Sequence, residues 1–276
     1  MLELAMCQPK FISTEIANNK WMEDLQDVDR KIDNDKAMRQ FFGLYSLLTQ
    51  ESFVHLIPPK EGLQDQVYCS NVACVLAHQD KTAILANFEA NGRTGEEYQA
   101  KGLLSSLGYD CVKLPYSFEG EADLKWIRDN IYIGGYGQRT SLKALEWIEQ
   151  NYDAEIIKLK KIDPYLYHLD CSVFPLDINN VLVCTEIVSR KTLQEIQNVA
   201  HIISVSYQQA LESITNSFRL GSVVHNIGSP TDGTTSSQKL IDICRNYNLS
   251  PSFVDLSEFV KSGAGLSCLI MHLTYS

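Results

Sequence analysis

The stretch "IYIGGYGQRTSLKALEWIEQNYDAEIIKL" (131–159) contains two short apolar runs with a helical pattern between them. The first run, 131–135, ends in a glycine-rich turn, and apolar residues then recur at helical spacing over 139–151. A second apolar run follows at 155–159 and has the length of a strand. Strand, turn, helix and strand in this order predict an α/β fold.

Short apolar runs of this kind recur along the whole chain and outnumber the helical patterns between them. The other clear helical patterns lie at 21–50, 93–107, 190–200, 206–215 and 236–247. Several strands per helix, without strict alternation, predict an α/β fold other than a doubly wound sheet. No linker rich in Pro, Gly or Ser divides the sequence, so we expect a single domain over residues 1–276.

Composition excludes several classes of protein. Hydrophobic residues make up 45% of the 276 residues and charged residues 21%, as in ordinary globular proteins. A formal net charge of −10 argues against nucleic acid or an anionic membrane as a partner. No run approaches the roughly 18 apolar residues of a membrane span, and the first residues lack the features of a secretory signal. We therefore expect a cytoplasmic protein.

The cysteines support the same location. They are scattered, lie mostly in apolar runs and form no Cys-x-x-Cys motif, at positions 7, 69, 74, 111, 171, 184, 244 and 268. This pattern fits reduced thiols better than a disulfide framework. Cys69 and Cys74 are five residues apart, which on a strand places them on opposite faces, so we expect no zinc site there.

Cys268, in the stretch "KSGAGLSCLIMHLTYS" (261–276), allows two interpretations. It is either a small core residue of a last strand or a nucleophile held at a strand end. The small residues before it leave room around the sulfur, and a tight turn can aim it. A base and an acid for such a nucleophile would come from elsewhere in the chain. These surroundings favour a cysteine hydrolase or transferase.

Two segments could supply the base and the acid. His168 and Asp170 are two residues apart, so on a strand they would face the same side. Glu119, Glu121 and Asp123 alternate, and would crowd three carboxylates on one face unless a cation lies opposite them. The alternative for each segment is a solvated strand or turn without a chemical role.

Two arginines lie in glycine-flanked loops. Arg139 follows "GGYG" (134–137), and Arg93 stands in "GRTG" (92–95). Glycine lets the backbone approach a ligand closely, and arginine binds carboxylates with two parallel hydrogen bonds. The pair could clamp a carboxylate, whereas isolated surface arginines are the simpler explanation. Neither loop has the residue order of a phosphate-binding loop.

Seven motifs, taken together, resemble the guanidino-modifying enzyme superfamily of deiminases, dimethylargininases and amidinotransferases. The likeness is greatest to the bacterial arginine dihydrolases. The motifs occur in the family's order and extend over nearly the whole chain: "NNKWM" (18–22), "GLQDQVYCSNVACVL" (62–76), "GRTGEE" (92–97), "FEGEAD" (118–123), "GGYGQRT" (134–140), "DPYLYHLD" (163–170) and "LSEFVKSGAGLSC" (256–268). The resemblance implies a five-bladed, pseudo-symmetric α/β propeller, the pentein fold, around a central polar tunnel.

The resemblance also implies residue roles. Cys268 matches the nucleophile that attacks the guanidinium carbon, His168 the general acid/base, and Glu121 the acid that orients the histidine. The remaining matches are to substrate-binding positions: Asp170 for the guanidinium, Arg93 and Arg139 for the α-carboxylate, and Asp65, Asn71 and Asn19 for further parts of the pocket. No metal and no cofactor is implied. The partner would be a small guanidino or ureido amino acid, and a homo-oligomer is compatible with the resemblance.

Asn71 distinguishes between subclasses. In ordinary arginine deiminases the matching position resembles an Asp, whereas an amide can donate a hydrogen bond to a ureido oxygen. Citrulline could then be held for a second attack, which would release ornithine, ammonia and carbon dioxide. This is the dihydrolase pattern. Arginine deiminase, citrulline hydrolase, dimethylargininase, amidinotransferase and a pentein-fold binding protein without activity remain the alternatives.

Overall fold

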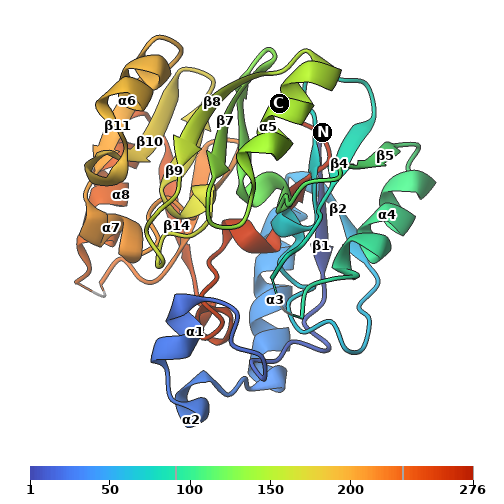
Figure 1. The fold of residues 1–276 in the computed structure, drawn as a ribbon. Helices are drawn as coiled ribbons and strands as arrows, with labels where there is room; N and C mark the ends of the chain where they lie inside the picture. Colours follow the sequence, from blue (N-terminus) through green and yellow to red (C-terminus); the bar gives the residue numbers. More distant parts are fainter. Residues whose placement is uncertain (91, 232, 276) are drawn as a thin grey trace.

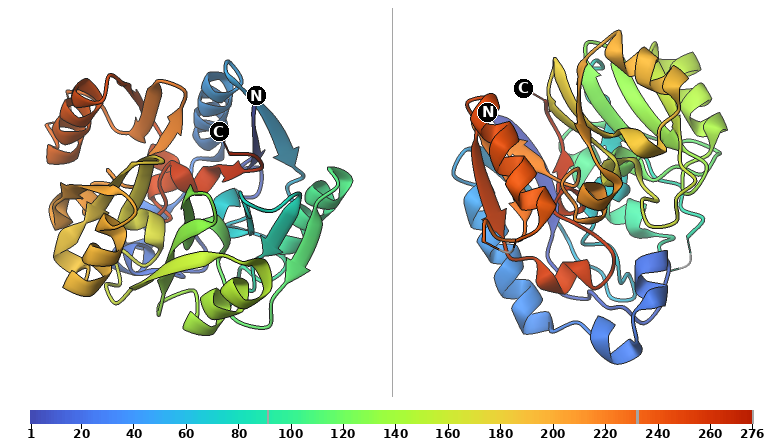
Figure 2. Two further views of the ribbon diagram at one scale, coloured as in Figure 1. Left: turned by 90° about the horizontal axis from the view of Figure 1, so that it is seen from above. Right: turned by 90° about the vertical axis from the view of Figure 1, so that its left-hand side faces the viewer.

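The computed structural model describes residues 1–90, 92–231 and 233–275. Within these ranges the strands form five three-stranded sheets. In each sheet the middle strand runs antiparallel to one neighbour and parallel to the other. The sheets are arranged as a ring around the centre of the molecule (Figures 1 and 2). This arrangement confirms the predicted five-bladed α/β propeller.

The unit that contains residues 131–159 shows how each sheet is built. Its elements are β6 (Leu124–Arg128), β7 (Ile131–Tyr136), α5 (Leu142–Tyr152) and β8 (Glu155–Lys160). β6 and β7 are antiparallel and need only a short turn, but β7 and β8 are parallel, so α5 must cross between them. Ser141 caps α5, and Leu145 and Ile148 on its apolar face are fully buried against the sheet.

Three further units repeat this order of strand, strand, helix and strand. Their elements are β3 (Ala73–Val75), β4 (Thr82–Leu85), α4 (Glu96–Ser106) and β5 (Asp110–Lys113); β9 (Val173–Asp177), β10 (Asn180–Cys184), α6 (Arg190–Gln197) and β11 (His201–Val205); and β12 (Phe218–Leu220), β13 (Val223–Ile227), α8 (Thr235–Asn246) and β14 (Ser250–Val254). The helices lie on the outside of the ring (Figure 2).

The fifth sheet joins the two ends of the chain. Its elements are β1 (Leu2–Cys7), α3 (Asn34–Leu48), β2 (Ser52–Ile57) and β15 (Met271–His272). β15 runs antiparallel to β1, and the N–H of Leu273 donates to the carbonyl of Glu3 at 2.9 Å. The ring is therefore closed by its last strand, and the two termini lie near one another (Figure 1).

The helical pattern at 21–50 is not one helix. It forms three helices, α1 (Lys20–Asp24), α2 (Asp27–Arg30) and α3, because the chain turns twice before Asp33 caps α3 with its side chain.

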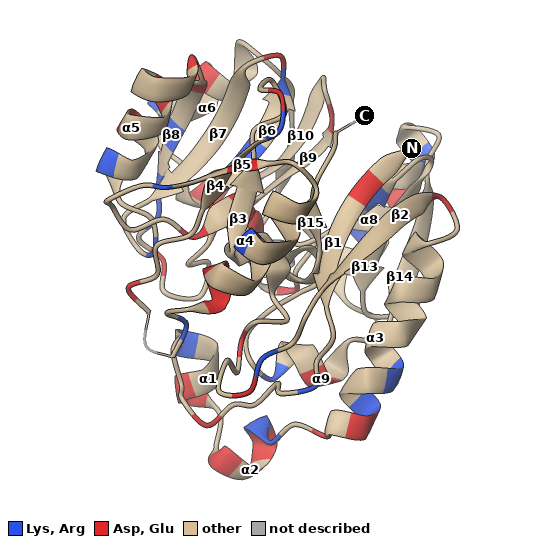
Figure 3. Ribbon diagram, turned by 90° about the vertical axis from the view of Figure 1, so that its right-hand side faces the viewer, with Lys and Arg blue, Asp and Glu red and all other residues tan. Residues whose placement is uncertain are grey.

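Two short helices elsewhere are α7 (Tyr207–Leu211) and α9 (Ser257–Val260). On the side drawn in Figure 3, charged residues are conspicuous on α2 and α3. In the described part of the chain, no helix has the length and apolar character needed to cross a bilayer.

Short 3-10 turns precede the first strand of a unit and point toward the centre of the ring. These turns are η1 (Cys69–Asn71), η2 (Gly120–Ala122), η3 (Leu169–Cys171) and η5 (Ser267–Leu269). Residues 215–217 occupy the same place before β12. The centre of the ring is thus lined by five equivalent segments, one from each unit.

The equivalent position three residues before the strand carries a buried polar or sulfur-containing side chain in every unit. The five residues are Ser70, Glu121, Asp170, Thr215 and Cys268. Cys268 is among them, so the fold itself brings this cysteine to the centre of the ring. It is not a residue of a regular core strand.

We predict that Gly120 is required for the contact between η2 and η1. Its φ is +61°, and a Cβ there would lie 2.5 Å from the carbonyl oxygen of Ser70 and 2.8 Å from that of Ala73. Backbone atoms cannot rotate away, so Gly120→Ala should lower the free energy of unfolding by about 3 kcal/mol in urea denaturation. Gly102→Ala is the control: this glycine lies within α4 with open space around it, and alanine should add about 0.5–1 kcal/mol. Equal effects of the two substitutions would contradict the assignment.

Candidate active site

A small cavity at the centre of the ring brings together residues from distant parts of the sequence. It is lined by Asn18, Asn19, Asp65, Tyr68, Asn71, Arg93, Arg139, Tyr167, His168, Ser262, Ala264 and Cys268. Seven of the nine predicted site residues are in this set; the exceptions are Asp170 and Glu121. The cavity measures only about 20 Å³, which is room for about one water molecule.

Cys268 lies on η5 with its sulfur in the wall of this cavity and is 4% exposed. Its Sγ lies 3.5 Å from Oδ2 of Asp170 and 3.4 Å from Nδ2 of Asn216. Burial, and secondly the carboxylate of Asp170, raise the pKa of Cys268 to about 12. Without a ligand, the sulfur is therefore a neutral thiol near pH 7, and a cation beside it would favour the thiolate.

Asp170 lies on η3 directly beside this sulfur and is fully buried. The hydroxyl of Ser267 donates to its Oδ2 at 2.7 Å, and the thiol of Cys171 lies 3.7 Å from its Oδ1. None of these neighbours carries a positive charge. The hydrogen-bond partners of Asp170 are thus neutral, and the buried amines of Lys125 and Lys161 act on it through their charge alone. A carboxylate in this position next to a thiol can attract a further cation into the site.

His168 stands at the start of η3 and is held by Glu119. The Nε2 atom of His168 lies 2.7 Å from Oε2 of Glu119, and both side chains are buried. Burial alone would raise the pKa of Glu119, but the hydrogen bond with His168 and the charges of Arg139 and Arg93 lower it to about 2. Glu119 is thus a permanent anion that orients the imidazole. Nδ2 of Asn71 lies 3.3 Å from Nδ1 of the same ring.

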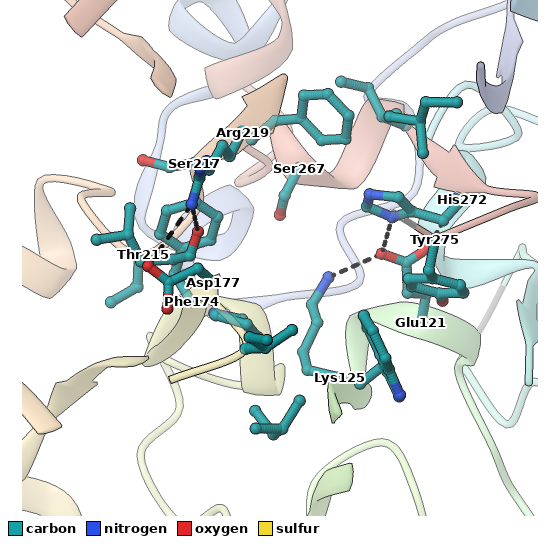
Figure 4. A pocket seen from close by; sticks show the side chains of 18 of the residues that line it. Glu121, Lys125, Phe174, Asp177, Thr215, Ser217, Arg219, Ser267, His272 and Tyr275 are labelled. Carbon is teal, nitrogen blue, oxygen red and sulfur yellow. Dashed lines mark hydrogen bonds and ion pairs between the residues drawn. The ribbon is translucent and has the colours of Figure 1, made fainter. Parts of the chain in front are cut away.

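The prediction that Glu121 orients His168 is wrong. Glu121 instead accepts the backbone N–H of His272 at 2.8 Å, and its Oε1 lies 2.8 Å from Nδ1 of His272 and 3.3 Å from Nζ of Lys125 (Figure 4). The resemblance assigns the orienting role to the second glutamate of "FEGEAD" (118–123), but in the structure it is the first, Glu119, that reaches His168. The segment is a 3-10 turn, so Glu119 and Glu121 face different surroundings.

Glu121 and Lys125 line a second cavity of about 410 Å³ (Figure 4). Ser267 also faces this second cavity, whereas its neighbour Cys268 faces the first.

Asp123, the third of the alternating carboxylates, stabilises a neighbouring turn of the backbone. It accepts the N–H of Leu169 at 2.9 Å and the hydroxyl of Thr140 at 2.7 Å, and so fixes the turn that carries His168 and Asp170.

Both arginines reach the first cavity. Nη1 of Arg93 lies 3.8 Å, and Nη1 of Arg139 3.4 Å, from the carboxylate of Glu119. Arg93 also forms an ion pair of 2.7 Å with Glu96, and its pKa is raised by this carboxylate despite burial. The guanidinium of Arg139 lies over the ring of Tyr167. The fold thus gathers two cations on one wall.

Asn19 and Asp65 also lie in the wall, but their side chains have structural partners. Asn19 caps α1, and its Nδ2 donates to the carbonyl of Ser262 at 2.9 Å. Asp65 accepts a hydrogen bond from Nδ2 of Asn18, a wall residue that was not singled out in the sequence. Among the described residues, no group of three or more His, Cys, Asp or Glu side chains could hold a metal ion.

Comparison with curated proteins gives two kinds of relative at similar identity. The bifunctional arginine dihydrolase/ornithine cyclodeaminase AgrE of Nostoc sp. is 27% identical over 99% of this chain, and this chain spans only 38% of that protein. The N(G),N(G)-dimethylarginine dimethylaminohydrolase of Mycobacterium tuberculosis is 28% identical over 98% of this chain and is matched over 85% of its own length.

Solved structures agree with this picture. The complex of AgrE with ornithine and NAD+ superposes with a TM-score of 0.90 at 26% identity, covering all of this chain and 40% of the other. A dimethylarginine dimethylaminohydrolase adduct has a TM-score of 0.73 at 20% identity, which shows a shared fold. The profile of the family described as "N,N dimethylarginine dimethylhydrolase, eukaryotic" matches residues 8–275. With a match over nearly its whole length, the chain belongs to the N,N-dimethylarginine dimethylhydrolase family.

Proposed function

We propose that this chain hydrolyses the guanidino group of L-arginine through a covalent intermediate on Cys268, yielding ornithine, carbon dioxide and two molecules of ammonia. The observation that carries the proposal is the cavity that Cys268 and His168 share, with Glu119 hydrogen-bonded to the imidazole from behind the wall and the amide of Asn71 beside it. Its dihydrolase relatives support arginine as the substrate.

The first step is ionisation of the nucleophile. The guanidinium of arginine would enter beside Asp170, whose hydrogen-bond partners are neutral. Its positive charge lowers the pKa of the adjacent Cys268 thiol, so that the nucleophile forms when the substrate is bound. The thiolate attacks the guanidinium carbon, and a tetrahedral adduct results.

His168 moves the protons in the steps that follow. It protonates the departing nitrogen, which leaves as ammonia and gives a thiouronium on Cys268. It then takes a proton from water, which attacks the same carbon, and citrulline and the thiol are restored. The charge of Glu119 stabilises the imidazolium that must form between these steps.

The second hydrolysis depends on keeping citrulline in place. Asn71 can donate a hydrogen bond to the ureido oxygen, and Arg93 and Arg139 can bind the α-carboxylate. In the second round Cys268 attacks the ureido carbon and ammonia leaves, which gives a thiocarbamate; water then cleaves its S–C bond, and the carbamate of ornithine loses carbon dioxide to give ornithine. Because the cavity is far smaller than arginine, some of its wall side chains must move when the substrate enters.

Hydrolysis of dimethylarginine is the second candidate. The family profile and the mycobacterial relative favour it, since that relative is matched over most of its length. The same Cys, His and Glu would serve both reactions. The substrates differ in the two methyl groups, which need extra apolar space around the guanidinium.

We predict that purified protein incubated with L-arginine releases about two molecules of ammonia per ornithine and forms no urea. The amounts of ammonia, citrulline, ornithine and dimethylamine are followed over time, with arginine and dimethylarginine as separate substrates. Citrulline that accumulates would make the protein a deiminase, and dimethylamine from dimethylarginine would favour the second candidate. Turnover by Cys268→Ala at the wild-type rate would disprove both.

We predict that Glu119→Gln lowers kcat by at least about 100-fold, because the imidazolium of His168 loses its anion. Glu121→Gln is the matched control and should leave kcat little changed. His272 and Lys125 outweigh burial and hold the pKa of Glu121 near 2, so this variant should instead lose roughly 2–4 kcal/mol of unfolding free energy. The reverse ranking of the two kcat values would return the orienting role to Glu121.

We predict that Asn71→Asp changes the product more than the rate of arginine consumption. A carboxylate can still attract the guanidinium, but it presents only acceptors to a ureido oxygen. Citrulline should therefore accumulate where the wild type forms ornithine, as chromatography of the reaction mixture would reveal. Unchanged ornithine formation by the variant would remove Asn71 from the second hydrolysis.

A further inference from the structure

Asn216 lies beside the reacting sulfur but was not recognised in the sequence. It stands in the segment between α7 and β12 and is 4% exposed. Its Nδ2 lies 3.4 Å from Sγ of Cys268, although 52 residues separate the two in sequence. This distance is within the range of an amide hydrogen bond to sulfur.

The orientation of this amide is determined by its other partner. The backbone N–H of Ser267 donates to Oδ1 of Asn216 at 2.8 Å. A backbone N–H can only donate, so the oxygen must face Ser267 and the NH2 group must face the sulfur. The amide therefore turns its NH2 group to Cys268 at 3.4 Å, while its Oδ1, held by Ser267, lies farther from the sulfur at 3.8 Å.

Gly265 keeps the amide in this place. A Cβ on this residue would lie 2.5 Å from Oδ1 and 2.7 Å from Cγ of Asn216. The glycine thus lets the loop before Cys268 pack directly on the asparagine. Gly265 is the second glycine of "SGAGLSC" (262–268), and its lack of a side chain permits this close contact.

The propeller provides the same residue twice in equivalent places. Asn216 is two residues before β12, and Asn71 is two residues before β3. Asn71 contacts His168, whereas Asn216 contacts Cys268. The same position of two units thus supplies an amide to each of the two reacting side chains.

Two of the strongest influences on the sulfur disfavour a negative charge, because burial and the carboxylate of Asp170 raise the pKa of Cys268. A backbone hydrogen bond at Gly265 and the side-chain hydrogen bond from Asn216 act in the opposite direction. A hydrogen bond to an anion is stronger than one to a neutral acceptor, so the amide would favour the thiolate over the thiol.

We infer that Asn216 is a catalytic residue that donates a hydrogen bond to the Cys268 thiolate, both when the sulfur attacks and when it leaves. The inference rests on the proposed function in that Cys268 must be the nucleophile. In the leaving step the S–C bond breaks and its electron pair returns to sulfur. The NH2 group of Asn216 stabilises that charge until the sulfur regains a proton.

The test is the rate at which iodoacetamide alkylates Cys268 in the substrate-free protein, followed by mass spectrometry of the peptide that contains it. Alkylation needs the thiolate, so its rate at fixed pH reports the ionised fraction. Asn216→Ala removes the donor, and we expect alkylation about tenfold slower; Asn216→Asp places an acceptor against the sulfur and should be slower still. Wild-type rates in both variants would overturn the inference.

Asn226→Ala is the matched control. Asn226 is 2% exposed, and its Nδ2 donates to the carbonyl of Ser213 and the hydroxyl of Ser217, away from the sulfur. It should lose thermal stability as Asn216→Ala does while Cys268 is alkylated at the wild-type rate. If Asn216→Ala fails to fold, the isosteric Asn216→Asp carries the test.

The outcome can be separated from that of the proposed function. Alkylation requires no turnover, so slower alkylation of the Asn216 variants supports the inference even if neither arginine nor dimethylarginine is a substrate. Turnover that requires Cys268, together with wild-type alkylation of both variants, would leave the function standing and refute the role of Asn216.

Discussion

The pairing of β15 with β1 is the contact on which the candidate site depends. Only two residues of β15 pair with β1, yet they hold the C-terminal end of the chain in the same sheet as its N-terminal strand and so close the ring. Cys268 precedes this strand by three residues, so the position of the sulfur is set by the hydrogen bonds of the closing strand. A site assembled from both ends of the chain exists only in the fully folded ring, since no single unit contains the nucleophile and the base together.

Electrostatics at the centre of the ring follow from burial. The carboxylates of Glu119 and Asp170 are both withdrawn from water, but their partners differ. Glu119 is surrounded by His168 and two arginines and is fully compensated, whereas Asp170 has hydroxyl and thiol neighbours. Lys125 and Lys161 interact with Asp170 only through their charge, so no cation is hydrogen-bonded to this carboxylate beside the sulfur among the described residues. A guanidinium ion would supply that cation and ionise the thiol in the same event, which limits reactivity toward other electrophiles when no substrate is bound.

The general architecture can be predicted from the sequence, but the side-chain contacts made by the turns at the centre of the ring cannot. Family membership, the five-bladed propeller and the α/β unit at 131–159 are confirmed, because strand and helix periodicities depend on local patterns. The contact of Glu119 with His168 and that of Glu121 with His272 could not be predicted, since they depend on a 3-10 turn with a glycine at positive φ. Asn216 was missed because its contact with Cys268 crosses units; the only signal was its position relative to the strand, which matches that of Asn71. The roles of the remaining site residues stay predictions.

The five equivalent turns also bear on how such a protein changes during evolution. The position three residues before the strand holds a serine, a glutamate, an aspartate, a threonine and a cysteine in the five units. Each of these side chains projects from a turn whose backbone is held by its own sheet. Asp170 and Cys268 are in contact, with 3.5 Å between Oδ2 and Sγ, so a change at either of these two positions also alters the surroundings of the other. A ring of this kind lets the scaffold be inherited unchanged while side chains at a few equivalent positions around its centre vary.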